Sequence, residues 1–276
     1  MSQSSRVWFI TGSSSGFGRC LAELALARGE RVVATARAVT AVADLVGAHR
    51  ERLCTVALDV TRPDQVRAAV ARAREVFGRI DVLVNNAGYG LQGAVEDVSD
   101  AQIRAVFETN VFGALDVTRA ALPLLRAQGS GHIVNISSVG GRLSMPLVGI
   151  YSATKFALEG FSIALAEETA GYGVKVTLIE PGAFATRFGS PASLISVPAS
   201  APYAPLGEAI ASALASFKWG DPRRVAEAII EVCDSGEPPL HLVLSEQALG
   251  MVRRSLNDQI AELARWEALS IKASPG

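Results

Sequence analysis

A tyrosine and a lysine stand four residues apart near the middle of the chain, in the stretch YSATK from Tyr151 to Lys155. In a helix, this spacing places the two side chains on one face. An ammonium group near a phenol favours the phenolate and lowers the pKa of the tyrosine, so the pair could exchange a proton near neutral pH. The same spacing also arises by chance, so the pentapeptide alone does not distinguish an acid/base pair from two ordinary helix residues.

Further polar residues are predicted to meet this pair at one edge of a sheet. Ser138 ends a predicted strand, Asn110 lies in the motif ETNVFG on a predicted helix, and the motif NNAG at 85–88 follows another predicted strand. Open α/β sheets bind ligands at the carboxyl ends of their parallel strands, which is where these residues are expected. Ser137 is expected to point away from Ser138, because successive strand residues face opposite sides of a sheet.

A glycine-rich turn, TGSSSGFG at 11–18, follows the first predicted strand and precedes a predicted helix. Its glycines permit a tight turn and a close approach of the backbone to a ligand, and the helix N-terminus can bind phosphate oxygens. The spacing is GxxxGxG, without the GK[ST] ending of an ATP-binding loop. We therefore expect the turn to bind the pyrophosphate of a dinucleotide. The turn residues expected to contact the cofactor are Gly12, Ser14, Ser15, Gly16, Phe17 and Gly18.

The end of the second predicted strand bears on which dinucleotide is preferred. A carboxylate there would bind the ribose 2′-hydroxyl of NAD, but the strand ends in Ala36-Arg37. The guanidinium of Arg37 could pair with a 2′-phosphate through charge-assisted hydrogen bonds. The sequence therefore predicts NADP(H) in preference to NAD(H).

Composition excludes several other classes of protein. The 276 residues are 49% hydrophobic and 19% charged with a net charge of −1, so the chain can bury a core and has no electrostatic reason to bind nucleic acid or an anionic membrane. The three cysteines form no metal-binding or disulfide pattern, and the start of the chain has no secretory signal. No apolar run approaches the roughly 18 residues of a membrane span. We expect a cytoplasmic protein without a metal site, because the three histidines (His49, His132 and His241) are far apart.

Short apolar segments alternate with helical patterns along the whole chain. Alternation of this kind predicts an α/β fold: a single-domain, Rossmann-like, doubly wound parallel sheet of about seven strands with helices on both faces, spanning 1–276. The segment 187–206 is rich in proline and serine, and we expect 187–220 to form a mobile substrate-binding loop or lid. The expected strands are 6–11, 31–36, 53–60, 80–88, 131–138, 174–182 and 241–244, and the expected helices begin near 16, 40, 63, 100, 150 and 246.

Taken together and in this order, the motifs resemble the short-chain dehydrogenase/reductase family, from about Val7 to Thr186. The resemblance implies that Tyr151 is the proton donor, and that Lys155 lowers the pKa of this tyrosine and holds the nicotinamide ribose. It also implies that Ser138 hydrogen-bonds the substrate oxygen and that Asn110 holds a water molecule in a proton relay.

The resemblance further implies a set of cofactor contacts beyond the glycine-rich turn. Some members that use NADP carry a basic residue where this chain has Ser15, so the cofactor preference depends on Arg37 alone. The implied contacts to adenine, ribose and nicotinamide are Asp59, Val60, Asn86, Ala87, Gly88, Tyr151, Lys155, Pro181, Gly182 and Thr186.

These features predict an NADPH-dependent carbonyl reductase, or alcohol dehydrogenase in reverse, acting on a small hydrophobic ketone or aldehyde rather than on a charged sugar or a carrier thioester. Arg142 and Arg187 are the two cations that could grip a carboxylate. A non-catalytic redox sensor and a related lyase or epimerase are the alternatives, and a homodimer or homotetramer is expected from the family. The residues expected to line the substrate pocket are Val139, Leu143, Met145, Phe184 and Phe188.

Overall fold

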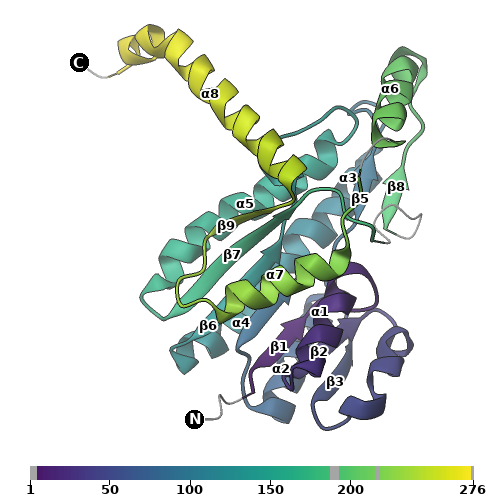
Figure 1. Cartoon of the computed structure of the whole chain (residues 1–276), viewed down its shortest axis with the longest axis vertical. Coiled ribbons are helices and arrows are strands. Elements are labelled where there is room, and N and C mark those ends of the chain that lie inside the picture. The colour runs from purple at the N-terminus through teal and green to yellow at the C-terminus, as the bar shows by residue number, and fades with distance from the viewer. Residues whose placement is uncertain (1–4, 187–192, 216–217, 275–276) are drawn as a thin grey trace.

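Seven parallel strands form one twisted sheet in the computed structural model, which describes residues 5–186, 193–215 and 218–274. The strand order is β3-β2-β1-β4-β6-β7-β9 (Figure 1). The first strand, β1, lies in the middle of the sheet. Strands β2 and β3 extend the sheet on one side of it and β4, β6, β7 and β9 on the other, so the direction in which strands are added reverses between β1 and β4. Their bounds are β1 Val7–Ile10, β2 Arg31–Ala36, β3 Leu53–Ala57, β4 Val82–Asn85, β6 Gly131–Ile136, β7 Val174–Pro181 and β9 His241–Leu244.

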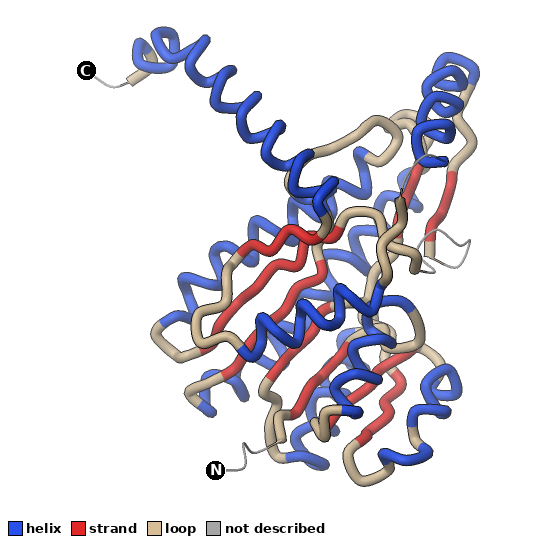
Figure 2. The backbone as a smooth tube through the Cα atoms, in the orientation of Figure 1, coloured by secondary structure: helices blue, strands red, loops and turns tan. Residues whose placement is uncertain are grey.

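Helices cover both faces of this sheet (Figure 2). Helices α1 (Gly16–Ala27) and α7 (Pro222–Asp234) pack on one face, and α2 (Pro63–Phe77), α4 (Ala114–Gln128) and α5 (Gly149–Ala170) pack on the other. The strands are buried between two apolar layers, which is why their sequences read as continuous apolar runs rather than alternating ones. The predicted fold class is confirmed.

Several elements differ from those predicted. The weak helix expected near 40 is two short 3₁₀ turns, η1 (Val39–Leu45) and η2 (Gly47–His49), and α7 was not predicted. The residues of α7 that pack on the sheet are Val225, Ala226, Ile229 and Ile230.

The segment expected to be a loop or lid contains regular structure. Within 193–215, strand β8 (Leu194–Ser196) pairs in parallel with β5 (Gly90–Gln92) in a separate small sheet, and η6 (Ala201–Tyr203) leads into α6 (Ala204–Ala215). Residues 187–192 and 216–217 lie outside the described residues. The mobility of the segment stays a prediction.

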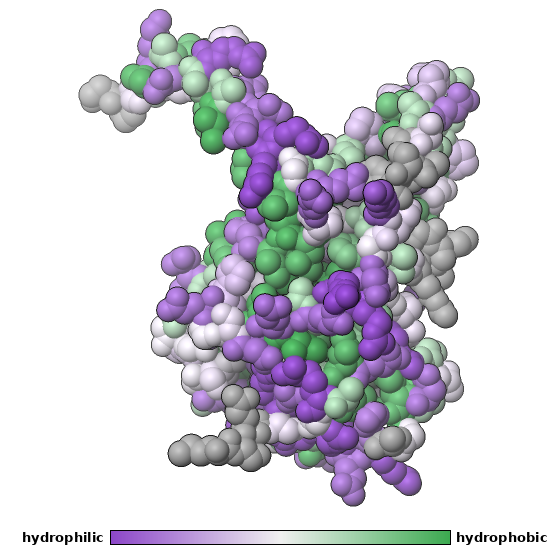
Figure 3. Space-filling view, viewed as in Figure 1, coloured by the Kyte–Doolittle hydropathy of each residue, from purple (hydrophilic) through white to green (hydrophobic). Residues whose placement is uncertain are grey.

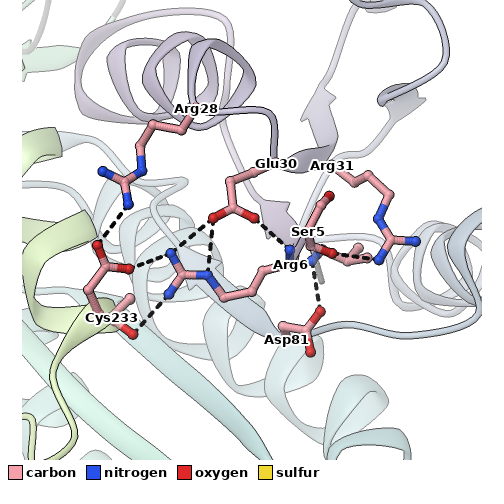
Figure 4. Close-up of polar contacts among 9 residues, drawn as sticks. Ser5, Arg6, Arg28, Glu30, Arg31, Asp81 and Cys233 are labelled. Atoms are coloured by element: carbon pink, nitrogen blue, oxygen red, sulfur yellow. Dashed lines mark hydrogen bonds and ion pairs between the residues drawn. The ribbon is translucent and has the colours of Figure 1, made fainter. Parts of the chain in front are cut away.

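The amino ends of the strands are held by a network around Arg6 (Figure 4). Its guanidinium donates to Glu30 Oε1 at 3.1 Å, to Asp234 Oδ1 at 2.6 Å and to the carbonyl oxygen of Cys233 at 2.9 Å. This network joins the start of β1 to the end of α7, at the edge opposite the carboxyl ends of the strands.

The chain ends in α8 (Glu246–Lys272), whose far end projects from the body (Figure 1). None of the helices in the described part of the chain combines the length and apolarity needed to cross a membrane.

Candidate functional site

The glycine-rich turn lies between β1 and α1, as predicted. Gly12 and Gly16 adopt φ angles of +70° and +57°, which side chains rarely tolerate. A Cβ atom at Gly18 would lie 2.7 Å from the carbonyl oxygen of Gly12 and would also collide with the amide of Asn86. The turn is therefore held tight against the neighbouring loop, and α1 begins at Gly16 with its N-terminus at the carboxyl edge of the sheet. This arrangement fits a dinucleotide pyrophosphate.

The loop after β4 is tied directly to this turn. The hydroxyl of Thr11 accepts hydrogen bonds from the backbone amides of Asn86 (2.9 Å) and Ala87 (3.0 Å). The side-chain amide of Asn86 donates to the carbonyl oxygens of Thr11 (2.8 Å) and Gly12 (3.0 Å). These bonds join β1 and β4 at the point where the strand order reverses, which is where such sheets bind ligands.

Arg37 follows the end of β2 with its side chain exposed, and among the described residues it makes no hydrogen bond or ion pair. The carboxylate of Asp59 accepts from the amide (3.0 Å) and the hydroxyl (2.7 Å) of Thr61, so it shapes the turn before α2. Val60 is buried against Gly113, where a Cβ atom would lie 2.7 Å from Val60 Cγ2. The Arg37 side chain is therefore available to bind a ligand, whereas Asp59 and Val60 make contacts that stabilise the fold.

Asn110 lies in a wide helical turn that was not predicted. The expected single helix over 100–128 is α3 (Asp100–Phe107), a π-helical turn η3 (Glu108–Gly113) and α4. The Asn110 side chain is buried, accepts from the amide of Tyr89 (3.0 Å), and donates to the carbonyl oxygen of Tyr89 (2.9 Å) and the hydroxyl of Thr154 (3.2 Å). The π turn thus fixes Asn110 between the loop after β4 and helix α5, as such turns often do at functional sites.

Ser138, Tyr151 and Lys155 come together at the carboxyl edge of β6. The Ser138 side chain hydrogen-bonds Tyr151, and the Lys155 Nζ lies 5.8 Å from the centre of the Tyr151 ring. Lys155 is buried and donates to the carbonyl oxygen of Ile136 at 2.8 Å. Ser138 also accepts from the amide of Gly140 at 3.0 Å, which fixes its hydroxyl in place.

Burial has the largest effect on the pKa values of Tyr151 and Lys155. Burial raises the pKa of Tyr151 to about 12, and the hydrogen bond from Ser138 lowers it only in part. Burial also lowers the pKa of Lys155 to about 8, against the opposing charge of Glu159. The net shift for Tyr151 is upward because desolvation of the phenolate outweighs the hydrogen bond from Ser138. Tyr151 is therefore protonated at neutral pH. The lowering of the Tyr151 pKa attributed to Lys155 stays a prediction.

Gly88 lies close to both Asn110 and Lys155. A Cβ atom there would lie 3.0 Å from Asn110 Oδ1 and 3.9 Å from Lys155 Nζ. On the other side, the backbone amide of Gly182, just after β7, donates to the carbonyl oxygen of Leu244 at 3.0 Å. Thr186 reaches back to the glycine-rich turn, since a Cβ atom at Gly16 would lie 3.6 Å from Thr186 Cβ. Pro181, Gly182 and Thr186 thus lie at the same edge as the turn.

The residues predicted to line the substrate pocket pack against different parts of the fold. Val139 and Leu143 pack against the first turns of α8, and Met145 is exposed. Phe184 contacts the ring of Phe17 edge-on, with ring centres 5.7 Å apart, and lies against the apolar core. Phe188 and Arg187 lie outside the described residues. Sequence position placed these residues near the site, but contacts with α8 and α1 determine where their side chains point.

A buried polar cluster behind Lys155 was missed. Glu159, one turn after Lys155, lies with its carboxylate 3.3 Å from Nδ1 of His241, which is 2.7 Å from Oε1 of Glu180. Arg142 donates to both oxygens of Glu180 at 3.0 and 3.2 Å, so it is paired rather than free to grip a substrate carboxylate. The donor atoms of the two glutamates and the histidine lie within 4.8 Å of one another, but the guanidinium of Arg142 already supplies positive charge there.

Burial raises the pKa of Glu159 to about 7, and the nearby carboxylate of Glu180 adds to the effect. The hydroxyl of Ser137 faces this cluster, and Ser138 faces Tyr151 on the other side. The expected opposite orientation of the two serines is confirmed. The glutamate at the fourth position after Lys155 was the available sequence signal, since that spacing places both on one helix face.

The family model for the short chain dehydrogenases matches residues 6–193. The chain belongs to the short-chain dehydrogenase/reductase family. It is 40% identical over 274 residues to the oxidoreductase BOA17 of Botryotinia fuckeliana, covering 98% of this chain and 99% of that one. The crystal structure of a short-chain dehydrogenase from Streptomyces avermitilis is 42% identical, with a TM-score of 0.93, and covers 99% of this chain and 100% of that one.

Two other solved members of the family contain nicotinamide cofactors. A short-chain dehydrogenase from Burkholderia cenocepacia is in complex with NADP (26% identity, TM-score 0.76, 98% of each chain). Another from Burkholderia phymatum is in complex with NAD (28% identity, TM-score 0.78, 99% of this chain and 96% of that one). The chain is thus an oxidoreductase of the short-chain dehydrogenase/reductase family, and its fold and glycine-rich turn fit a nicotinamide dinucleotide.

Proposed function

We propose that this dehydrogenase reduces hydrophobic ketones or aldehydes with NADPH, and that Tyr151 is the acid that protonates the new alcohol. The observation that carries the proposal is the buried group of Ser138, Tyr151 and Lys155 at the carboxyl edge of the sheet, with Asn110 close by. A redox sensor needs only the cofactor half of this site.

The protonation state of Tyr151 supports the reducing direction. Reduction of a carbonyl leaves an alkoxide, which needs a proton from a donor at its oxygen. Because burial holds the pKa of Tyr151 at about 12, the phenol carries that proton at neutral pH. Ser138, already hydrogen-bonded to the phenol, would orient the substrate oxygen and stabilise its developing charge.

The cofactor preference rests on Arg37. The nicotinamide supplies the hydride when bound, and the glycine-rich turn with Asn86, Gly88 and Thr186 would hold it against Tyr151 and Lys155. The exposed and unpaired guanidinium at the end of β2 is suited to a ribose 2′-phosphate.

A lyase or epimerase reaction is the second candidate function, since the same tyrosine and cofactor could serve it. A panel of aromatic and alicyclic ketones, compared with anionic keto acids and sugar nucleotides, distinguishes the two by consumption of NADPH. Turnover of anionic substrates alone would overturn the proposed substrate class, and turnover without net oxidation of NADPH would favour the second function.

The variant Tyr151→Phe tests the acid directly. We expect it to bind NADPH nearly as tightly as the wild type and to lose on the order of 10²–10⁴-fold in turnover. Tyr172→Phe is the matched control, because Tyr172 is exposed at the end of α5 and packs on Arg126. Wild-type turnover in Tyr151→Phe would refute the role of Tyr151.

A further inference from the structure

Helix α8 is anchored to the body only by its first turns. Ala248 and Val252 are 1% and 5% exposed and pack with Val139 and Leu143. From Leu256 to Ser274, every residue is exposed. Figure 1 shows this part of the helix leaving the body as an isolated rod.

The apolar face that packs on the body continues along this rod. At 3.6 residues per turn, four large apolar residues lie on the same face as Val252. They are Leu256, Ile260, Leu263 and Trp266, exposed by 42%, 63%, 70% and 56%. Figure 3 shows apolar surface on the projecting helix beside strongly hydrophilic side chains. Most of the stability of protein helices comes from packing of an apolar face, so a partner that covers this face would also stabilise the helix.

Only two charged residues lie on this face of α8, and they have opposite signs. Arg253 and Glu267 are seven residues before and seven residues after Ile260. They are about 21 Å apart along the helix and cannot reach one another. Neither makes an ion pair with any other residue that the structure describes.

We propose that the partner is a second copy of this chain, with the two α8 helices packed antiparallel about a two-fold axis near Ile260. In this arrangement Arg253 of each copy lies opposite Glu267 of the other, and Leu256 lies beside Leu263 of the other. A parallel pair would instead place Arg253 against Arg253 and Glu267 against Glu267. A two-fold axis makes the surface complementary to itself, as closed homodimers require.

The charges of α8 argue against an anionic membrane as the partner. From Arg253 to Lys272 the helix carries four basic and three acidic residues, whereas helices that lie on anionic lipid are predominantly basic on their polar side. The palindromic placement of Arg253 and Glu267 also has no counterpart on a lipid surface.

Charge reversal tests the antiparallel pairing. We expect Glu267→Arg to raise the dissociation constant of the α8-mediated pair at least tenfold in sedimentation velocity, and Arg253→Glu to do the same. The double variant should restore association, because it exchanges the two charges. Arg265→Glu, on the opposite face, is the matched control and should leave the constant unchanged. Absence of rescue in the double variant, or a wild type that is monomeric at all concentrations, would overturn the proposal.

A cross-link locates the interface even if other surfaces also join subunits. With a short bismaleimide, Ile260→Cys should give chains cross-linked through α8, whereas Ala261→Cys on the far side of the helix should give only the wild-type background. Equal cross-linking of the two variants would contradict the antiparallel pair. Binding of the monomeric chain to phosphatidylcholine or phosphatidylglycerol vesicles, lost in Leu263→Asp, would assign the face to a membrane instead.

Discussion

Replacing Glu159 with glutamine should change how the stability of this protein depends on pH. Glu159 is 5% exposed, and its neighbours in the cluster include Glu180, Arg142 and His241. Ionising Glu159 places a second carboxylate next to Glu180 in a buried site, where the single guanidinium already pairs with Glu180. Glutamine has nearly the same shape and cannot ionise, so the variant isolates the free energy that it costs to ionise Glu159 in the folded protein.

The size and sign of the effect follow from the pKa of Glu159. The pKa of Glu159 in the folded protein is about 7, against an ordinary value of 4.5 for a glutamate. Between these values the folded protein binds more protons than the unfolded chain, so the free energy of unfolding of the wild type falls as pH rises. The difference between the two pKa values corresponds to about 3 kcal/mol in total. This loss of stability in the wild type is absent below about pH 4.5 and complete above about pH 7.

The assay is urea unfolding of both proteins at fixed chain concentration between pH 5 and 8.5. We expect Glu159→Gln to gain roughly 3 kcal/mol relative to the wild type across this range. Glu168→Gln is the matched control, because Glu168 is exposed on the same helix, and it should follow the wild type at every pH. A stability difference between Glu159→Gln and the wild type that does not change with pH, or that falls as pH rises, would refute the reasoning.

Three further predictions concern the cofactor site and the hydrogen bonds of Asn110. Arg37→Asp should move the ratio of KM for NADPH and NADH at least tenfold toward NADH, and an unchanged preference in steady-state kinetics would contradict the role of Arg37. Gly18→Ala should weaken cofactor binding, measured by fluorescence titration, more than it changes the free energy of unfolding, because a Cβ atom there displaces the Gly12 carbonyl and the Asn86 amide. Gly160→Ala is the control: the space around Gly160 is open, so this variant should bind the cofactor normally. Asn110→Leu should lower the free energy of unfolding by about 1–3 kcal/mol, because it leaves the partly buried backbone amide and carbonyl of Tyr89 unpaired. An unchanged melting temperature would argue against a stabilising role of these hydrogen bonds.

Much of the fold followed from local pattern. Buried parallel strands are continuous apolar runs, and β1, β2, β6 and β7 lie close to where such runs predicted them. Helix α7 was not predicted, although Val225, Ala226, Ile229 and Ile230 form a strong apolar face on it. The π turn at Asn110 was also missed, since its residues have ordinary helical propensity and the wider turn is formed where Gly113 packs against Val60.

The sequence by itself determined the family and the sheet, and it supplied the candidate residues of the site. Those features depend on glycine positions and on spacings within one strand or helix, which are local. Tertiary structure alone decided the charge state of the site and the direction of the pocket side chains. The pKa of Tyr151 depends on how completely the packed chain excludes water, and the cluster at Glu159 joins α5, β7 and β9, which are far apart in sequence. Tertiary structure also showed that α8 leaves the body at Leu256, because only the folded chain defines where its apolar face ceases to be covered.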